Sequence, residues 1–258
     1  MAESRLKIDV RRNRVLDVLR RDGRVCVSEL SRSLGATPVT IRNDLAALER
    51  DGHLVRVSGG AVLAQQGESS VSAERTDIKN MEEKLAIAGV VARMIRDGDT
   101  LFINSGTTTQ LIAAELRVRR NLNIVTNSLK VAERLGTIPT FRVLLLGGEL
   151  NASYGFTCGG DAQEQLGRYR ADWAILSVDG ISVDAGVTTY HAEEAAIDRM
   201  MAEGARQVLI AADRTKIGRA GFSRVCDCYE GLCIVTGSGE SGSELFELQQ
   251  QGVTVIRA

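Results

Sequence analysis

Two side chains suited to reading DNA bases stand next to each other in the stretch TPVTIRNDLAALER. Arg42 and Asn43 can each make two hydrogen bonds to one base edge, arginine to guanine and asparagine to adenine. Two small side chains, Val39 and Ala46, lie at helical spacing on the same side and would allow another surface to approach closely. A solvated helix face can have the same composition, so this stretch alone leaves both interpretations open.

A helix that starts after Thr37 would position these side chains. Thr37 can accept the first free N–H groups as N-cap, and Pro38 suits the first helical position because its missing N–H would have been unpaired there. Ile41, Leu45 and Leu48 recur at i, i+4 and i+7, which predicts an apolar stripe on the opposite face. We therefore expect the helix to pack through this stripe and to expose its small, polar face.

The sequence on either side predicts two more helices and a hairpin. In VSELSRSLGAT, Ser28 can cap a short helix and Gly35 can end it in a left-handed turn. The stretch RRNRVLDVLRRDG predicts an earlier helix that ends at the turn pair Asp22-Gly23. Downstream, two β-rich runs at 54–57 and 61–63 flank Ser58-Gly59-Gly60, as in a hairpin. This order predicts a winged helix-turn-helix, whose second motif helix enters the major groove.

The charge distribution supports contacts with DNA phosphates in the same region. Residues 1–63 contain 12 Lys and Arg against 8 Asp and Glu, whereas the remainder contains 20 against 25. A basic run suits phosphate contacts that position a protein without reading sequence, although such runs are often only solvated. The run comprises Arg5, Lys7, Arg11, Arg12 and Arg14. The candidate DNA contacts are Ser28, Thr37, Val39, Thr40, Arg42, Asn43, Ala46, Arg56 and Arg12.

A second stretch, FINSGTTTQL, could bind phosphate. The turn Ser105-Gly106-Thr107-Thr108-Thr109 lies between a predicted strand and a predicted helix. The glycine permits close backbone approach, the hydroxyls are donors, and the helix start adds free N–H groups and partial positive charge. The lysine of a GxxxxGK pattern is missing, so this is not a nucleotide-binding P-loop. A hydroxyl that only caps the helix remains the alternative.

From Met81 onward, helical and strand-like segments alternate, and the strands are rich in Val, Ile and Leu. The strands are expected in TLFIN, LNIVT, FRVLLL, WAILSV, QVLIAA, LCIVT and VTVI. This alternation predicts a mainly parallel sheet covered by helices. The predicted fold class is α/β, with an N-terminal winged helix-turn-helix and a larger α/β domain. We set the domains at residues 1–63 and 81–258, with the polar segment 64–80 as a linker or loosely packed connector.

Five polar or glycine-rich loops follow strands of this sheet and predict one composite pocket, because ligands of such sheets bind at the carboxyl ends of strands. Asn127, Glu149 and Asp179 could hold sugar hydroxyls, and Lys216 could hold an anion or a substrate oxygen. Each residue singly is better explained as a turn former or a surface charge. The candidate set is Lys84, Asn104, Ser105, Gly106, Thr107, Thr108, Thr109, Asn127, Gly147, Gly148, Glu149, Asp179, Gly180 and Lys216.

Length and composition exclude several other classes of protein. With 258 residues and 44% apolar content, the chain can form one small and one larger core. The start, MAESRLKIDVRR, is charged throughout and no run of about 18 apolar residues occurs, so we expect a cytoplasmic protein without membrane contact. Five cysteines, an odd number, favour reduced thiols. The cluster CDCYEGLC has a spacing unusual for a metal site and the chain has only two histidines, so we predict no metal and no cofactor.

Together these motifs resemble the DeoR family of bacterial transcriptional regulators over nearly the whole chain. The DNA-binding part of the resemblance is TPVTIRNDLAALERDGHLVRVSGGAVL. The remainder comprises EEKLAIAGVVARMIRDGDTLFINSGTTT, NIVTNSLKVAERL, VLLLGGEL, SVDGI and AADRTKIG. The resemblance implies a sensor domain similar to ribose-5-phosphate isomerase, and a repressor of a sugar-catabolic operon that responds to a phosphorylated sugar. It also implies that the SGTTT turn holds the phosphate and that the helix after Thr37 reads the operator.

Two positions depart from the family pattern. Asn43 stands where a second arginine is usual before the aspartate, which predicts a different operator preference at the base that faces it. Asn104 stands where the family often has an aspartate two residues before the glycine of SGTT, which weakens any carboxylate role there. Both departures concern the identity of operator and ligand and leave the family resemblance unchanged.

We therefore expect a regulator rather than an enzyme, acting as a homodimer or homotetramer on double-stranded operator DNA. The alternative is a sugar-phosphate isomerase or deaminase with an accessory DNA-binding domain, because Lys216 with Asp179 or Glu149 would supply an acid and a base. That alternative leaves residues 1–63 without a function. A general nucleic-acid-packaging role fits poorly with a basic excess that is modest and local.

Overall fold

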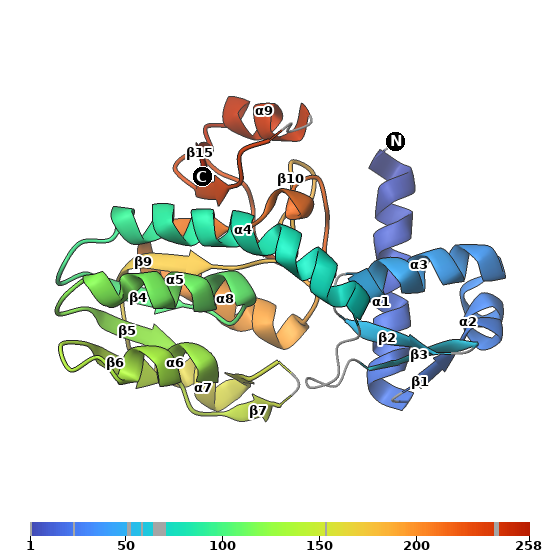
Figure 1. Ribbon diagram of the computed structural model, residues 1–258, viewed down its shortest axis with the longest axis horizontal. Helices are drawn as coiled ribbons and strands as arrows, with labels where there is room; N and C mark the ends of the chain where they lie inside the picture. The colour runs from blue at the N-terminus through green and yellow to red at the C-terminus, as the bar shows by residue number, and fades with distance from the viewer. Residues whose placement is uncertain are drawn as a thin grey trace. The chain divides into compact units, whose positions relative to one another are not determined.

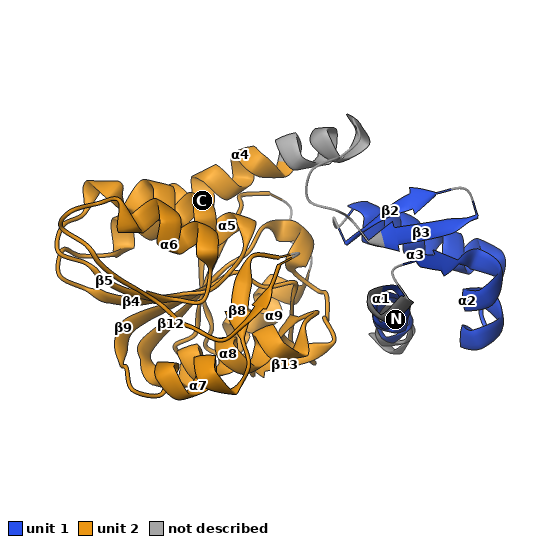
Figure 2. Cartoon of the chain, turned by 90° about the horizontal axis from the view of Figure 1, so that it is seen from below, with its two compact units in different colours: residues 1–79 blue, residues 80–258 orange. Residues whose placement is uncertain are grey.

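The computed structural model describes residues 2–22, 24–50, 53–57, 59–63, 71–152, 154–239 and 243–258. The chain divides into two units, residues 1–79 and 80–258 (Figure 2). Three features predicted from the sequence fall partly outside the described residues: Gly23 of one turn, Ser58 of the other, and residues 64–70 of the linker.

The first unit begins with the three helices that the sequence predicted, in the predicted order. α1 (Ala2–Asp22) precedes α2 (Val27–Leu34) and α3 (Pro38–Arg50). α2 ends at Gly35, which has a left-handed φ of 61°, and Thr40 N donates to Thr37 Oγ1 at 3.2 Å at the start of α3. Both predicted helix ends are therefore confirmed. The apolar stripe of α3 is buried, as its spacing predicted.

α2 begins two residues earlier than the sequence predicted. Its N-cap is Cys26, in an extended conformation, and Ser28 lies inside the first turn with an exposed side chain. The prediction that Ser28 caps this helix was therefore wrong. The reason is a strand that the sequence analysis did not include, β1 (Arg24–Cys26), which leads directly into the helix.

β1 completes a three-stranded sheet with the predicted hairpin. β2 (Leu54–Val57) and β3 (Gly60–Leu63) pair antiparallel, and β1 pairs with the other edge of β3. Gly60 allows this close approach, because a Cβ there would lie 1.8 Å from the carbonyl oxygen of Val25. A strand of three residues is too short for its side-chain period to be recognised in the sequence.

The second unit is built on a seven-stranded sheet in which every neighbouring pair is parallel (Figure 1). All seven strands predicted from the sequence are present. They are β4 (Thr100–Ile103), β5 (Asn123–Thr126), β6 (Arg142–Leu145), β9 (Ala171–Leu176), β12 (Ala205–Ala211), β14 (Cys233–Thr236) and β15 (Thr254–Arg257). The strand order is β15-β14-β12-β9-β4-β5-β6. The loops after β4, β9 and β12 therefore follow three adjacent strands.

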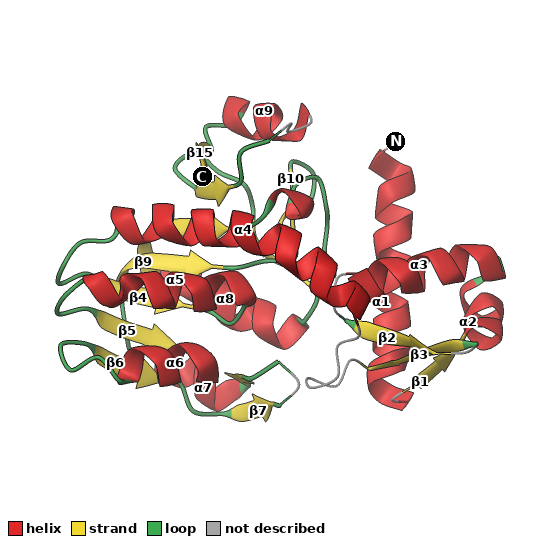
Figure 3. Cartoon of the chain, viewed as in Figure 1, coloured by secondary structure: helices red, strands yellow, loops and turns green. Residues whose placement is uncertain are grey.

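Helices cover both faces of this sheet, and each face has its own core (Figure 3). One core joins the sheet to α4 (Val71–Met94), α5 (Thr107–Glu115) and α6 (Leu129–Gly136). The other joins it to α7 (Gly160–Leu166), α8 (Ala192–Gly204) and α9 (Ser243–Gln250). In β4, Leu101 and Ile103 belong to the first core and Phe102 to the second, as the alternation of side chains along a strand requires.

Short antiparallel strands extend the loops of the second unit. β7 (Glu149–Asn151) pairs with β8 (Phe156–Cys158). β11 (Gly186–Thr189) lies between β10 (Gly180–Ser182) and β13 (Ser223–Cys226). Two 3-10 helices, η1 (Leu116–Val118) and η2 (Arg214–Lys216), complete the described elements. The sequence analysis treated the residues of β10 and η2 as loops.

α4 starts at Val71, eleven residues before the helix that the sequence predicted in the stretch EEKLAIAGVVARMI. Residues 71–80 are therefore helical where a linker was expected. The stretch VSAERTDIKN lacks an apolar period, but a helix that already has a packed face extends at little cost through polar residues of fair helix propensity. In the part of the chain that the structure describes, no helix is both long and apolar enough to cross a membrane.

Candidate functional site

The outer face of α3 exposes the side chains selected as base readers. Arg42, Asn43 and Val39 are exposed, and Ala46 and Thr40 are half-buried. The Thr40 hydroxyl lies 2.8 Å from the Thr37 hydroxyl, so both serve the helix start. Arg42 and Asn43 are thus the exposed side chains of this face with the geometry for paired hydrogen bonds to a base.

Asp44 points to the opposite side of α3 and ties this helix to α1. It is 2% exposed and accepts hydrogen bonds from Arg11 Nε at 2.5 Å, from Arg11 Nη2 at 3.3 Å and from Arg12 Nε at 3.1 Å. Arg12 was selected from the sequence as a phosphate contact, but its Nε–H pairs with Asp44. The Nη groups of Arg12 are then the ones that could face a phosphate.

The two remaining candidates of the first unit lie on other elements of the motif. Ser28 is exposed on α2, and Arg56 is exposed on β2. The backbone N of Arg56 donates to Glu49 Oε1 at 2.8 Å, which connects β2 to the last turn of α3. The wing strand is therefore anchored to the helix that carries Arg42 and Asn43.

The turn between β4 and α5 uses most of its hydroxyls internally. Ser105 Oγ donates to Glu194 Oε1 at 2.6 Å, Thr109 Oγ1 donates to Gly106 O at 3.0 Å, and Thr108 is buried. Thr107, the first residue of α5, is exposed. Of the hydroxyls selected from the sequence, Thr107 is therefore the one presented to solvent beside the N–H groups of the helix start.

Gly106 sets the path of this turn. Its φ of 152° lies in a region that residues with a side chain rarely adopt. An added Cβ would lie 2.8 Å from both Cβ and Oγ of Ser177. The backbone of the turn consequently passes directly against the end of β9, which places the start of α5 at the carboxyl edge of the sheet.

Lys84 of α4 brings a positive charge to the turn. Its Nζ donates to Thr107 Oγ1 at 3.2 Å and lies 4.0 Å from Asp213 Oδ2. Asp213 follows β12 and is fixed by hydrogen bonds from Thr215. Three elements distant in sequence therefore meet at Thr107.

Lys216 and Asp179 form a second pair, with Nζ and Oδ1 3.6 Å apart. Asp179 follows β9, and its other oxygen accepts hydrogen bonds from Tyr190 N at 3.0 Å and Thr189 Oγ1 at 2.9 Å. Gly180 begins β10 directly after it, and a Cβ there would lie 2.6 Å from the carbonyl oxygen of Arg219.

α8 supplies two buried carboxyl groups that the sequence analysis did not select. Burial and the nearby Asp179 raise the pKa of Glu194 to about 7, and burial and Glu194 raise the pKa of Asp198 well above its usual value. A signal for both was present, since they stand four residues apart on the face that also carries Ile197 and Met201.

Asn104 lies beside Asp198, and its amide NH₂ group donates a hydrogen bond to that carboxyl. Its Nδ2 donates to Asp198 Oδ2 and to Ser177 O, both at 2.9 Å, and its Oδ1 accepts from Ser177 N at 2.9 Å. An aspartate at this position would place a second carboxyl against Asp198. The departure from the family pattern therefore has a physical explanation in the neighbouring acid.

The other selected residues make hydrogen bonds toward β8 and α7. Asn127, after β5, donates through Nδ2 to Thr157 O at 3.2 Å. Gly147, after the edge strand β6, donates through its backbone N to Gln165 Oε1 at 3.0 Å, and the exposed Gly148 leads into β7, which begins at Glu149. Lys84 thus meets Thr107 and Asp213, Lys216 pairs with Asp179, and the loop after β6 follows the edge strand of the sheet.

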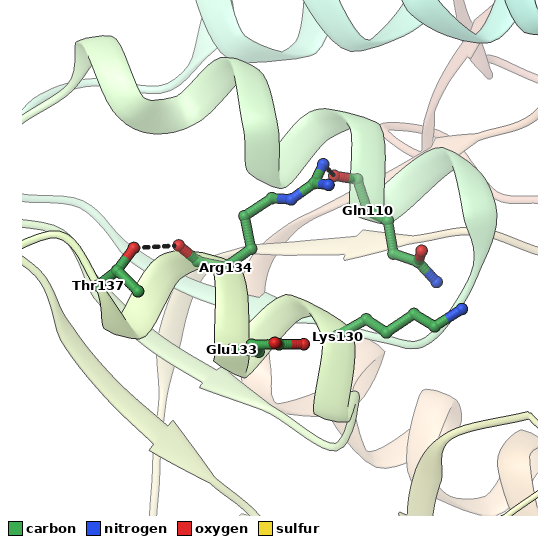
Figure 4. A pocket seen from close by; sticks show the side chains of 5 residues that line it. All are labelled: Gln110, Lys130, Glu133, Arg134 and Thr137. Carbon is green, nitrogen blue, oxygen red and sulfur yellow. Dashed lines mark hydrogen bonds between the residues drawn. The ribbon is translucent and has the colours of Figure 1, made fainter.

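A surface pocket of about 440 Å³ lies between α5 and α6 (Figure 4). In it, Arg134 Nη1 donates to the backbone O of Gln110 at 3.1 Å, and Thr137 Oγ1 donates to Arg134 O at 2.9 Å. The remaining lining residues are Lys130 and Glu133. None of these five residues belongs to the set selected from the sequence.

Cys158 and Cys233 are buried thiols, Cys226 and Cys228 are partly buried, and Cys26 is exposed. Burial is the main cause that raises the pKa of Cys226 to about 12 and that of Cys228 to about 11. Thiols with such pKa values are poor nucleophiles at neutral pH. Among the described residues, no group of three or more His, Cys, Asp or Glu side chains is arranged to hold a metal ion.

Two family models match this chain, one for each unit. The model of the DeoR-like helix-turn-helix domain matches residues 11–67, and the model of the DeoR C terminal sensor domain matches residues 79–238. The chain belongs to the DeoR family. It is therefore a DeoR-family transcriptional regulator, with a helix-turn-helix domain followed by a sensor domain.

Relatives of this DeoR-family chain include named repressors. It is 33% identical to a putative aga operon transcriptional repressor of Escherichia coli O157:H7, over 95% of this chain and 92% of the relative. It is 36% identical to the glycerol-3-phosphate regulon repressor of Escherichia coli strain K12, over 83% of this chain and 84% of the relative. Ribose 5-phosphate isomerase A from Methanocaldococcus jannaschii aligns in structure with a TM-score of 0.40 and 14% identity, over 54% of this chain and 55% of that one.

Proposed function

We propose that this DeoR-family regulator represses a carbohydrate-catabolic operon, and that a phosphorylated sugar bound at the start of α5 changes its affinity for operator DNA. The names of two relatives support the class of target, since one refers to the aga operon and the other to a glycerol-3-phosphate regulon. The base-reading residues in this proposal are Arg42 and Asn43 on α3.

The observation that carries the proposal is the meeting of Lys84 with Thr107 at the N-terminus of α5. A phosphate there would meet a lysine charge, a hydroxyl donor and the free N–H groups of a helix start, which together are the ordinary means of holding a dianion. A sugar without phosphate lacks the charge that these groups hold. Asp179 and Lys216 are then the residues proposed to meet the sugar.

Replacement of Thr107 by valine tests this assignment. The Thr107→Val protein should bind operator normally without ligand, yet need about tenfold or more sugar phosphate to release it, because a charge-assisted hydrogen bond is lost. Titration calorimetry with glycerol 3-phosphate, ribose 5-phosphate and glucose 6-phosphate, each beside its unphosphorylated counterpart, measures the binding step. A gel-shift titration with the same compounds measures release.

Thr137→Val is a matched control, since Thr137 is an exposed threonine at the end of α6. It should behave as the unmodified protein in both assays. Equal affinity for free sugar and sugar phosphate, or unaltered release in Thr107→Val, would exclude the 105–109 turn as the phosphate site.

Ligand can alter operator affinity only to the extent that it binds two arrangements of the protein unequally. Filling the site is therefore insufficient by itself. We propose that the ligand acts on the homodimer or homotetramer, or on residues 64–80, which precede Lys84 in the chain. Two recognition helices on half-sites about one helical turn apart would explain a need for the assembled form.

Single substitutions on α3 test the DNA-binding half of the proposal. Arg42→Ala and Asn43→Ala should each relax the preference among operator variants by about 1 to 3 kcal/mol, the size of one paired base contact. Competition binding against a library of single-base operator variants measures this. Arg50→Ala, at the exposed end of the same helix, serves as control. An unchanged ranking of variants in Asn43→Ala would show that Asn43 does not read a base.

The alternative function, sugar-phosphate isomerisation or deamination, would need Lys216 with Asp179 or Glu149 as acid and base. Lys216 and Asp179 are ion-paired with each other, and Glu149 lies in the exposed strand β7, which pairs with β8 outside the seven-stranded sheet. These placements favour a binding site. Incubation with pentose and hexose phosphates distinguishes the two functions, because product formation would favour the enzyme.

A further inference from the structure

α8 carries two carboxyl groups into the interior of the second unit. Glu194 is 9% exposed and Asp198 is fully buried. Buried carboxyls lower stability unless they are hydrogen-bonded or paired with opposite charge. The hydrogen-bond partners of Glu194 lie on elements that also form the proposed effector site. Glu194 therefore lies between two parts of that site, the turn after β4 and the Asp179–Lys216 pair.

Contacts of Glu194 connect the turn after β4 to the Asp179–Lys216 pair. Ser105 Oγ donates to Glu194 Oε1 at 2.6 Å, and Thr189 Oγ1 lies 3.1 Å from Glu194 Oε2. The same Thr189 Oγ1 lies 2.9 Å from Asp179 Oδ2, whose carboxyl is paired with Lys216. One continuous path of polar contacts thus runs from the 105–109 turn to Lys216.

The Thr189 hydroxyl indicates where a proton resides on this path. It has one proton for two carboxyl oxygens, so when it donates to Asp179 its lone pairs face Glu194. That contact is favourable when Glu194 itself carries a proton and donates it to Thr189. The other oxygen of Asp179 lies 3.6 Å from Lys216 Nζ.

We propose that Glu194 is the positioning residue of the effector site, because it holds Ser105 and hence the 105–109 turn. The turn binds the phosphate of the ligand when Glu194 is protonated. This inference rests on the proposed function, since it concerns the same turn. Ionised Glu194 would place a negative charge directly behind Ser105, next to the site proposed for a phosphate dianion. Protonated Glu194 keeps the same contacts without that charge.

The charged groups around Glu194 come from several elements. The charge of Asp179 raises the pKa of Glu194, and Glu194 in turn raises the pKa of Asp198. Lys216 lies behind Asp179, and Lys84 lies beyond Ser105, at Thr107. His191 is the N-cap of α8 and packs edge-on against Tyr154 at 4.2 Å between ring centroids.

Binding of inorganic phosphate to the full chain tests the proposal, because phosphate is the part that all sugar phosphates share. Glu194→Gln retains an oxygen for Ser105 and gains an NH₂ donor for Thr189, so it imitates protonated Glu194 at every pH. The ratio of the Kd of the unmodified protein to that of Glu194→Gln should rise about fivefold between about pH 6.5 and about pH 8. The ionisation of phosphate itself cancels in this ratio.

Two further variants separate positioning from a general charge effect. Glu193→Gln removes the same charge from the exposed neighbouring position on α8, and it should follow the pH dependence of the unmodified protein. Glu194→Ala should bind phosphate about tenfold more weakly than Glu194→Gln at both pH values, because Ser105 loses its partner. The proposal would be overturned if the ratio of the Kd of the unmodified protein to that of Glu194→Gln stayed constant with pH. It would also be overturned if the same ratio taken against Glu193→Gln rose with pH.

Hydrogen exchange without ligand keeps this inference separable from the proposed function. Peptides covering residues 104–112 should exchange faster in Glu194→Ala and in Ser105→Ala, and at the normal rate in Glu194→Gln. If phosphate binds to no variant, the phosphate site of the proposed function fails, and the exchange rates still decide the role of Glu194. Unchanged exchange in both alanine variants would show that Glu194 does not position the turn.

Discussion

Replacement of Gly106 by alanine should weaken sugar phosphate binding to the full chain by about 10- to 100-fold and leave operator binding without ligand intact. The φ of 152° and ψ of 158° at Gly106 lie in a region that costs a residue with a side chain about 1 to 3 kcal/mol. The added Cβ would also lie 2.8 Å from Cβ and Oγ of Ser177. Since Cβ of Ser177 is fixed to its backbone, the turn itself has to move and takes Thr107 away from Lys84.

Two variants establish that the cause lies at this turn. Gly136→Ala places a Cβ with no atom within 4 Å at the end of α6, and it should have no effect or stabilise the helix slightly. Ser177→Gly combined with Gly106→Ala removes the clash and keeps the backbone strain, so it should recover part of the lost affinity. Calorimetry with the sugar phosphate that binds the unmodified protein measures all three. Normal binding by Gly106→Ala would place the phosphate elsewhere than the start of α5.

The sequence predicted the second unit well wherever an element is long and has a clear period. All seven strands of the parallel sheet are runs rich in Val, Ile and Leu, and buried parallel strands need that composition. The three-residue strands β1, β7, β8 and β10 were missed, because three residues carry too little period. The first ten residues of α4 were missed because they have no apolar face.

In the candidate site, the sequence predicted which residues belong to the turn but did not predict which contacts they make. The turn 105–109 was recognisable from its glycine and hydroxyls, but the direction of each hydroxyl depends on partners distant in the chain. Ser105, for example, is turned inward by Glu194, which is 89 residues away. Asn127 and residues 147–149 follow strands as Thr107 does. The strand order, which the sequence does not specify, decides that they lie farther along the sheet.

Removal of Asp44 should destabilise the first unit by about 3 kcal/mol. Asp44 is buried and accepts hydrogen bonds from both Arg11 and Arg12, so its loss leaves two guanidinium groups without their anion. Breaking a buried ion pair costs about 3 to 5 kcal/mol. We expect the lower end, since the two arginine side chains are 21% and 22% exposed and can recruit water. Urea unfolding of Asp44→Ala followed by circular dichroism, with hydrogen exchange of α3 to assign the transition, measures this.

The arginine variants show whether Asp44 acts as the shared partner. Arg11→Met and Arg12→Met should each cost less than Asp44→Ala, because Asp44 keeps the other arginine in either case. If one arginine variant cost as much as Asp44→Ala and the other cost nothing, one arginine would carry the whole interaction. Asp44→Ala should also weaken binding to every operator variant alike, since α3 loses its tie to α1 while Arg42 and Asn43 are unchanged. If Arg12 also contacts a phosphate through its Nη groups, Arg12→Met should lower the salt dependence of operator binding by about one ion, whereas Arg11→Met should leave it unchanged.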